Sequence, residues 1–237
     1  MSAGKRFPYV LSLLLLLGMV TGVAATPITI NFNGLSSDGS VLLEQGFVLD
    51  PGARDWSPDA QGYIGHYHIA TPGAGWLADN GTNFMVVDYF LDNTTLNVYS
   101  TSGAAFGLQG MDLAEALIPG VSSCSALPLP PYQVAFTGYL AGGGTLSRSV
   151  TLDMICDGAG PQIDFERFAF DSSWGNLVML TIEQLTLRGT PFSNLGIDNL
   201  ALQTVPEPNS VALVALALVA TGFVRRRRYT AGAAAAG

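Results

Sequence analysis

His66 and His68 are the only histidines in the chain, and their spacing is the first feature that could support chemistry. On a strand, side chains two residues apart lie on the same face, so both rings would share one side of segment 63–70. Two imidazoles can begin a metal site, which Asp55 or Asp59 could complete with a carboxylate. A cupin-type site needs a third, distant histidine, and no residue that would orient the rings can be identified. We therefore interpret the pair as polar residues on the solvent face of a strand.

No other catalytic arrangement can be identified. A Ser-His-Asp triad would need one of the same two histidines, and no Gly-x-Ser-x-Gly turn supports it. Glycoside hydrolysis needs only two carboxylates, but no pair stands out among the acidic residues. A phosphate-binding glycine loop would be followed by a lysine, and Lys5 is the only lysine in the chain. The prediction is a non-enzymatic protein, and a polysaccharide-processing enzyme is an alternative that the carboxylates leave open.

Aromatic side chains could form a binding surface. Trp56, Tyr63, Tyr67 and Trp76 lie in a stretch rich in Gly, Pro and Asp. Aromatic faces in such a region can stack on sugar rings, and Trp56 and Trp76 would do so in a carbohydrate-binding module, the second predicted function. Such residues also fill the end of a β-sandwich, and we favour this core-packing interpretation.

The N-terminus predicts export. Lys5 and Arg6 precede an apolar stretch at residues 10–20, which is followed by the small residues Ala24 and Ala25. A positive region, an apolar core and a small-residue cleavage site define a secretory signal peptide. We predict that signal peptidase removes residues 1–25 and that the rest of the chain crosses the inner membrane.

Residues 26–204 form the predicted exported domain, which has the length of a single domain and is strongly acidic. It holds seventeen acidic residues against four arginines and no lysine, a net charge of −13. Such a charge repels phosphate backbones, so nucleic acid is not an expected partner. Cys124 and Cys156 are the only cysteines. In an oxidising compartment an isolated pair predicts a disulfide, with two unrelated buried thiols as the alternative.

Short runs of β-branched and aromatic residues, separated by Gly, Pro, Asn and Asp, predict an all-β domain. Several runs alternate, as where Tyr132, Val134 and Phe136 share one face, and this pattern predicts an antiparallel β-sandwich of jelly-roll type. The expected strands are residues 28–32, 41–49, 63–70, 84–91, 104–108, 132–140, 146–155, 163–170, 178–187 and 195–202.

Breaks in the alternation predict β-bulges in segments 163–170, 178–187 and 195–202. In the second of these the break is expected after Ile182, and in the third at Asp198-Asn199. Gly142-Gly143-Gly144 predicts a hairpin loop. Residues 112–117 are the one short helical candidate.

The C-terminal region, residues 205–228, combines a proline-flanked acidic motif, an apolar segment and a basic cluster. The uncharged segment 210–224 has fifteen residues. As a helix it would span about 22 Å, against ~30 Å for the hydrocarbon core, so we expect a short transmembrane helix. The basic cluster would stay in the cytoplasm and the domain outside. The motif and basic residues are Pro206, Glu207, Pro208, Arg225, Arg226, Arg227 and Arg228.

This combination resembles the sorting signal of the PEP-CTERM family. The resemblance implies processing by an exosortase, a membrane enzyme, and delivery to the cell surface or the exopolysaccharide matrix. In that family the arginines usually end the chain, whereas here the Ala- and Gly-rich residues 229–237 follow, which we predict to be a disordered tail. The predicted function is an exported structural or adhesive protein of the cell envelope or matrix, transiently anchored by its tail.

The exported domain also resembles jelly-roll carbohydrate-binding modules, through Ile-Asn-Phe-Asn at 30–33 and Gly-Ile-Asp-Asn-Leu at 196–200. In such modules an Asp of the closing strand often ligates a structural calcium ion. The resemblance implies a calcium ion on Asp198, with Asn31, Asn33 and Glu44 as further oxygen donors. The alternative is that Asp198 and Asn199 only make a turn with their own backbone. No other cofactor is expected.

We predict that replacement of Glu207, or deletion of residues 225–228, leaves the protein in the inner membrane, because the processing enzyme no longer recognises the tail. Cell fractionation that compares tail-tagged with N-terminally tagged protein measures this. Release of the altered proteins at the normal level would contradict the prediction.

Overall fold

The computed structural model describes residues 25–35, 41–52, 67–71, 78, 80–87, 95–116, 130–153, 155, 165–186 and 194–205. Residues 26–205 form one compact unit. Several predicted features lie outside the described residues: His66, Trp56, Trp76, Cys124, Cys156, the motif Pro206–Pro208, the apolar segment 210–224 and the arginines 225–228. No helix in the described part of the chain is long and apolar enough to cross a membrane.

The described domain is built from antiparallel strands, as the sequence predicts. The strands are β1 (Pro27–Ile30), β2 (Leu42–Glu44), β3 (Phe47–Asp50), β4 (Tyr67–Ala70), β5 (Phe84–Val87), β6 (Leu96–Ser100), β7 (Phe106–Glu115), β8 (Gln133–Leu140), β9 (Thr145–Thr151), β10 (Glu166–Ala169), β11 (Leu177–Gln184) and β12 (Leu195–Thr204). One short 3₁₀ helix, η2 (Ser172–Trp174), precedes β11.

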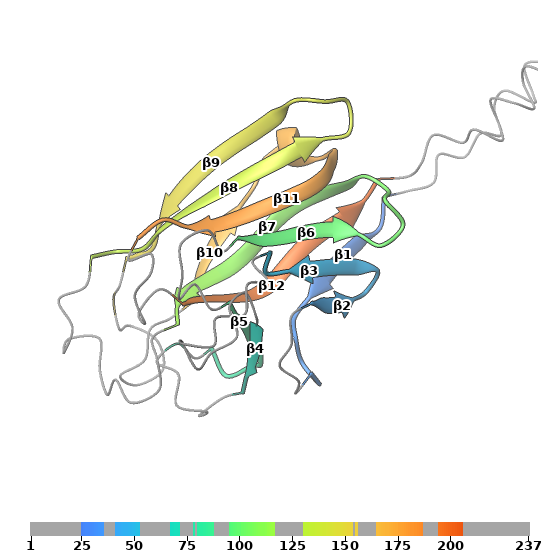
Figure 1. The fold of residues 1–237 in the computed structure, drawn as a ribbon. Helices are drawn as coiled ribbons and strands as arrows, with labels where there is room; N and C mark the ends of the chain where they lie inside the picture. The colour runs from blue at the N-terminus through green and yellow to red at the C-terminus, as the bar shows by residue number, and fades with distance from the viewer. Residues whose placement is uncertain are drawn as a thin grey trace, which may run out of the picture. The chain divides into compact units, whose positions relative to one another are not determined.

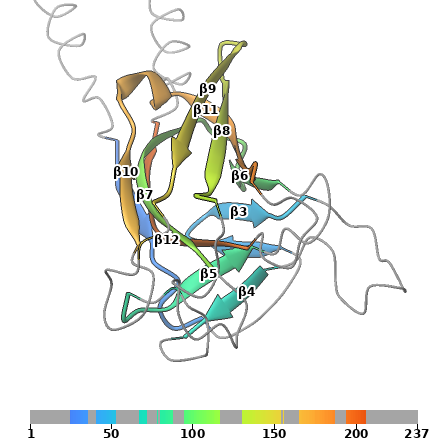
Figure 2. The same cartoon turned by 90° about the vertical axis from the view of Figure 1, so that its left-hand side faces the viewer.

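Strand pairing divides these elements into two layers. The order β9-β8-β11-β6-β3-β2 forms what we call the front layer, which faces the viewer in Figure 1. The rear layer contains β10, β7 and β12 in that order. The edge of β12 that does not pair with β7 pairs with β5 at residues 195–197 and with β1 at residues 200–203. Leu177 opposite Phe106 joins the layers where β11 meets β7. Figure 2 shows β10 and β7 on one side and β8 and β6 on the other. This is the predicted β-sandwich.

The core lies between the layers and is rich in aromatic rings. Phe47 of β3 meets Phe106 of β7 edge to face, with ring centroids 5.4 Å apart. Phe136 of β8 meets Phe170, which follows β10, at 5.1 Å, and Phe170 also meets Trp174 at 5.0 Å. Such pairs contribute about 0.5–1.5 kcal/mol each beyond the area they bury. These contacts tie β3 and β8 of the front layer to the rear layer.

Two expectations about secondary structure are wrong. The helical candidate at residues 112–117 is a strand through Glu115, because β7 pairs there with β12 and β10 and its side chains are mostly buried. Segment 41–49 is a hairpin, β2 and β3, rather than one strand. Its turn is made by Gln45 and Gly46, both with positive φ (48° and 83°). Strand β6 was not expected at all.

The bulges are partly where the sequence predicts them. In β12 the register shifts between Asp198 and Ala201, as expected. In β11 the shift lies at Leu177–Met179 and not after Ile182. Alternation continues past Ile182, so the polar Gln184 is buried and Leu185 is 40% exposed. A bulge after Ile182 would have turned Leu185 toward the core, but the pairing of β11 with β8 fixes which face each side chain occupies.

We predict that Gly110→Ala destabilises the domain by about 1–3 kcal/mol and lowers its melting temperature. A Cβ at Gly110 would lie 2.8 Å from the backbone oxygen of Phe168, so β10 would have to move away from β7. Gly142→Ala is the matched control, since a Cβ there meets nothing within 4 Å. Thermal unfolding measures both variants, and equal melting temperatures would contradict this account of β10.

Candidate functional site

The outer face of the front layer follows from strand alternation. Alternate residues of three central strands are fully buried: Val134 and Phe136 on β8, Leu180 and Ile182 on β11, and Leu96 and Val98 on β6. Successive side chains of a strand point to opposite faces, so the residues between these point away from the core. These outward positions form the candidate site.

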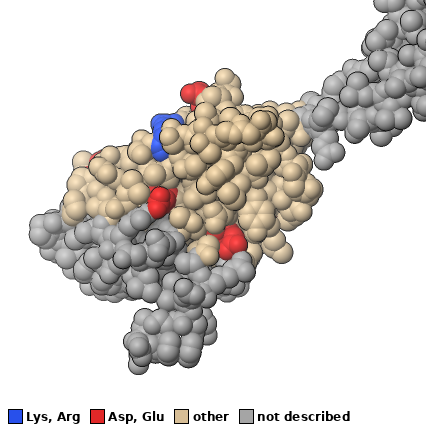
Figure 3. Space-filling model, turned by 45° about the horizontal axis from the view of Figure 1, so that its top comes forward, with Lys and Arg blue, Asp and Glu red and all other residues tan. Residues whose placement is uncertain are grey.

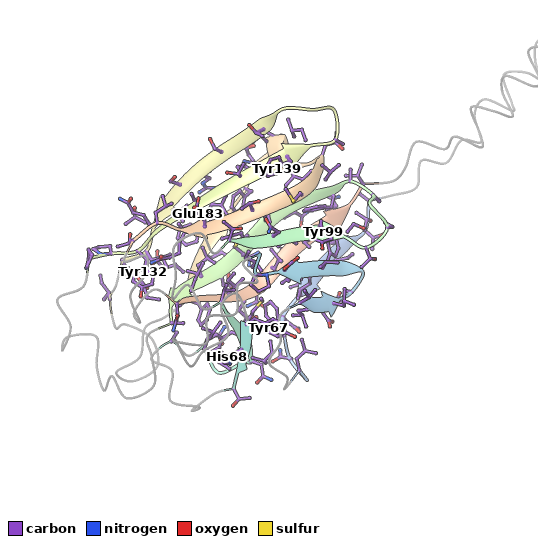
Figure 4. All side chains as sticks on the ribbon, viewed as in Figure 1. Tyr67, His68, Tyr99, Tyr132, Tyr139 and Glu183 are labelled. Atoms are coloured by element: carbon purple, nitrogen blue, oxygen red, sulfur yellow. The ribbon has the colours of Figure 1, made fainter. Side chains whose placement is uncertain are left out.

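Two tyrosines and a methionine form a row across this face. Met179 of β11 pairs with Tyr139 of β8, and the β11–β6 register, with Leu180 opposite Val98, puts Tyr99 beside Met179 on its other edge. Tyr139 is 37% exposed. Figure 4 shows Tyr139 and Tyr99 on the layer that faces the viewer. We call Tyr139, Met179 and Tyr99 the tyrosine row.

Uncharged polar side chains form the neighbouring row. Thr181 of β11 lies between Thr137 of β8 and Asn97 of β6. Its Oγ1 donates a hydrogen bond to Asn97 Oδ1 at 2.9 Å. Ser147 of β9 lies opposite Thr137 and extends the row. We call Ser147, Thr137, Thr181 and Asn97 the polar row; its hydroxyl and amide groups can exchange hydrogen bonds with a ligand.

The charge on this face is negative or absent among the described residues. The carboxylates are Asp50, which is opposite Asn97, and Glu183, two positions beyond Thr181. The two described arginines lie elsewhere. Arg148 stacks on the Phe170 ring at 4.9 Å, and Arg167 pairs with Asp112 of the rear layer at 2.9 Å. Most of the described surface seen in Figure 3 is uncharged.

A second polar group, the Asp198 cluster, surrounds the bulge of β12 in the rear layer. The Asp198 carboxylate is fully buried and accepts hydrogen bonds from Asn80 Nδ2 (2.7 Å), Thr82 Oγ1 (2.9 Å) and the backbone N–H of Asn199 (2.7 Å). Asn199 has a φ of 47° and its Nδ2 donates to Asp112 at 2.7 Å. The cluster therefore ties the loop before β5 to β12, where the partner of β12 changes from β5 to β1.

Burial raises the pKa of the Asp198 carboxyl, and the neighbouring Asp112 adds to this effect, whereas the hydrogen bonds from Asn80, Asn199 and Thr82 oppose it. A pKa that is higher in the folded than in the unfolded state means that the folded protein binds the proton more tightly. The contribution of this carboxyl to stability is therefore greatest below its unfolded pKa and falls as the pH rises through its folded pKa.

The four predicted calcium ligands are only partly brought together. Asn33 Oδ1 accepts from the backbone N–H of Asn83, in the same loop that contacts Asp198. The Oδ1 of Asn31 accepts from the backbone N–H of Asn33 instead. Glu44 lies on β2, in the other layer. Among the described residues no group of three or more His, Cys, Asp or Glu could hold a metal ion. The calcium site stays a prediction, and the contacts of Asp198 in the structure are hydrogen-bond donors.

Tyr67 and His68, two further residues considered in the sequence analysis, lie on β4. Tyr67 of β4 is buried, which agrees with core packing, and His68 beside it is half-buried opposite Val86. Glu115, Gln184 and Asn194 are fully buried polar residues that the sequence did not indicate, whereas Tyr132 is buried as its alternating strand predicts. Burial raises the pKa of the Tyr132 phenol well above its usual value, and the nearby Glu115 adds to the shift.

The tyrosine row was also missed from the sequence. Tyr139 has the same phase as Gln133, Ala135 and Thr137 on its strand, so the alternation marks it as an outward aromatic residue. Tyr99 has no such signal, because β6 itself was not predicted.

Comparison with known proteins confirms the sorting signal. The family model described as "PEP-CTERM protein-sorting motif" matches residues 204–228. No curated protein matches the chain.

Three solved structures are similar to the chain at a low level. One is a DUF4465 family protein from Bacteroides caccae. The match is 15% identical, covers 76% of this chain and the full length of that protein's chain, and has a TM-score of 0.44. A Stig cyclase from Fischerella sp. TAU, in complex with an indole derivative, is 14% identical over 78% of this chain and 100% of its own, with a TM-score of 0.40. CtCBM11 is 11% identical over 80% of this chain and 100% of its own, with a TM-score of 0.31. Similarity this low carries no argument about function.

We predict that Asp198→Ala lowers the free energy of unfolding by about 2–4 kcal/mol, because the donors of Asn80, Thr82 and Asn199 lose their common acceptor.

Thermal melts with calcium and with chelator separate the hydrogen-bonding role of Asp198 from the predicted calcium-binding role. If calcium binds there, a saturating ion at a hundred times its dissociation constant adds about 2.7 kcal/mol to the wild type and not to the variant. Identical wild-type melts under both conditions would exclude the ion, and an unchanged variant would exclude the structural role.

Proposed function

We propose that this chain, whose PEP-CTERM motif makes it an exported protein sorted by exosortase, is an adhesive component of the cell envelope or exopolysaccharide matrix. It would bind polysaccharide without changing it chemically, through the outer face of the front layer.

The observation that supports this proposal is the tyrosine row. Tyr139 is exposed and Tyr99 is half-buried. Rings held on a sheet can present flat apolar faces, which suits the faces of sugar rings. The adjacent polar row supplies hydroxyl and amide groups beside those faces, as glycan hydroxyls require. Tyrosine also loses little conformational entropy on binding, because it has only two side-chain torsions. A single ring binds weakly, but many copies of the protein in a matrix would act together.

The described carboxylates favour a binding protein over the alternative, a glycoside-processing enzyme. Asp112 and Asp198 lie opposite each other on β7 and β12, but Asp112 is paired with Arg167 and Asp198 is buried among donors. Two catalytic carboxylates would instead flank an open cleft that admits a glycosidic bond. Asp50 and Glu183 both lie on the outward face, but on β3 and β11, which are separated by β6.

We predict that Tyr99→Ala and Tyr139→Ala each weaken binding of the full-length protein to matrix polysaccharide by roughly fivefold to thirtyfold, the loss of about 1–2 kcal/mol expected for a stacking ring. Retention on immobilised polysaccharide, followed by titration, measures this. The Tyr→Phe variants keep the ring and should bind nearly as well as the wild type.

The matched control is Ile155→Ala, which removes an apolar side chain that is 51% exposed but lies outside the tyrosine row. Melting curves show whether each variant is folded. Wild-type binding by both alanine variants would contradict the proposal and shift attention to Trp56 and Trp76. Measurable turnover of the polysaccharide would favour the enzyme.

A further inference from the structure

We propose that the outer edge of β9 is a self-association surface, at which β9 of a second copy of this chain pairs as an antiparallel strand. Strand β9 pairs with β8, and none of the described strands pairs with its other edge. Figure 1 shows β9 along the upper border of the front layer. The inference is independent of the proposed function, because it concerns the edge of the layer and not the binding of polysaccharide.

The hydrogen bonds at the two ends of the β8–β9 hairpin show which backbone groups of β9 point outward. Leu152 donates its N–H to Tyr132 O (2.9 Å), and Leu140 donates its N–H to Gly144 O (3.1 Å). The register between these bonds has no shift, and the hydrogen-bonded pairs of an antiparallel ladder recur at every second residue. The even-numbered residues of β9 therefore bond to β8. The N–H and C=O groups of the odd-numbered residues point to the open edge, and these residues are Thr145, Ser147, Ser149 and Thr151.

The outward residues of β9 carry none of the features that usually protect an edge strand from pairing. All of them are exposed, and all have small hydroxyl side chains without charge. Natural edge strands are commonly kept short or charged. The other described border strands follow this rule, since β1, β2, β4 and β10 have only three or four residues, and β2 and β10 contain charged residues. Strand β9 has seven residues and is the exception among the described strands.

The one charged side chain of β9 is held on the inner side of the layer. Arg148 donates a hydrogen bond to the backbone oxygen of Ala169, and its guanidinium stacks on the Phe170 ring at 4.9 Å. Ala169 ends β10 of the rear layer and Phe170 follows it. The positive charge therefore lies beneath the front layer, and a strand that approaches β9 in the plane of the sheet meets no charge from the outward residues.

A second copy of the same chain fits this edge because an antiparallel pair is symmetric. The two-fold axis of such a pair is perpendicular to the sheet, so each outward N–H of one copy meets an outward C=O of the other. Ser and Thr side chains that face each other across the strands also stabilise the pair by hydrogen bonds. The exported domain has a net charge of −13, but β9 itself contains no acidic residue, so the pairing sets no two carboxylates opposite each other.

The register follows from what lies at the centre and the ends of β9. An axis beside Arg148 would set the two arginines opposite each other, which is unfavourable. An axis beside Ser149 would bring the second copy to Asp153, where the carboxylate of Glu166 already occupies the edge by accepting the N–H of Asp153 at 2.7 Å. An axis beside Ser147 instead brings it to the turn Gly142-Gly143-Gly144, which has no side chains to obstruct it. We therefore place the axis beside Ser147.

Pairing at β9 extends the front layer into one sheet that spans two copies. Because the axis is perpendicular to the sheet, the outward faces of both copies stay on the same side, and two tyrosine rows lie on one continuous face. The pairing uses the β9 edge of both copies, so the assembly is a closed dimer and not a fibre. Two strand edges make a smaller contact than a standard interface, so we expect a weak dimer that fills at high local concentration.

Sedimentation velocity of the full-length protein, in enough detergent that few micelles hold two chains, measures association as the protein concentration rises. We expect reversible dimerisation of the wild type. Ser147→Pro removes the outward N–H at the axis but leaves the bonds to β8, because proline is tolerated where the N–H faces away from the ladder. It should weaken dimerisation by roughly tenfold or more, since both hydrogen bonds of the central pair are lost. Ser147→Lys sets two ammonium groups opposite each other and should also weaken it.

Gln133→Lys is the matched control. Gln133 is exposed on β8, so the variant adds the same charge one strand away from the edge and should dimerise like the wild type. Melting curves show whether each variant is folded.

Cysteine substitution tests the register. On mild oxidation Ser147→Cys should give a disulfide-linked dimer, because directly opposed Cα atoms of a hydrogen-bonded pair are about 5.5 Å apart, within the range of a disulfide. Ser149→Cys should not, because the two copies of residue 149 would be about 13 Å apart along the strands. The wild type, oxidised in parallel, shows any linkage through Cys124 or Cys156.

The outcomes separate the parts of the inference. A wild type that stays monomeric at every concentration, or dimers that both Ser147→Pro and Ser147→Lys form as tightly as the wild type, would overturn the inference. Growth into larger oligomers would overturn the closed two-fold pair. Linkage through Ser149→Cys in place of Ser147→Cys would overturn the register alone. None of these measurements involves polysaccharide, so the proposed function stands or fails separately.

Discussion

Strand β12 and its bulge are the constraint on which the rest of the domain depends. One edge of β12 is paired with β7 along most of its length, while the other edge pairs with β5 at residues 195–197 and with β1 at residues 200–203. Between these partners the ladder must break, and Asn199 accepts the positive φ there at little cost because Asn tolerates it. Asp198 fills the break and holds the loop before β5. The position of the whole rear layer follows from this junction.

The same strand controls how the domain connects to the ends of the chain. Thr204 donates its backbone N–H to Thr26 O, and the N–H of Val205 donates to Ala105 O, so hydrogen bonding continues to the residue before Pro206. Proline has no N–H and cannot extend a ladder. The sorting motif therefore begins where the sheet must end.

The sequence predicted the features that depend on alternation within one strand, and it missed those that depend on which strands pair. Tyr132, Val134 and Phe136 were placed in the core correctly because their strand alternates, and the β12 bulge was found because Leu200 breaks the phase. Residues 112–115 were misjudged because a strand buried on both faces lacks alternation. Tyr99 and Tyr139 form a row only through the β6–β11–β8 register, which no local pattern contains. The sorting signal could be identified from the sequence because its motif, apolar segment and arginines are contiguous, so it does not depend on tertiary structure.

The division into layers also separates the strands that connect to the chain ends from the proposed binding face. The chain enters and leaves the domain through β1 and β12 of the rear layer, whereas the tyrosine row lies on the front layer, and the aromatic core joins them. Outward side chains of a strand contribute little to the stability of such a sandwich, and surface substitutions usually change it by less than about 0.5 kcal/mol. Under the proposed function, substitution of Tyr99, Thr181 or Asn97 would therefore change the ligand while the core and the β12 junction stay fixed.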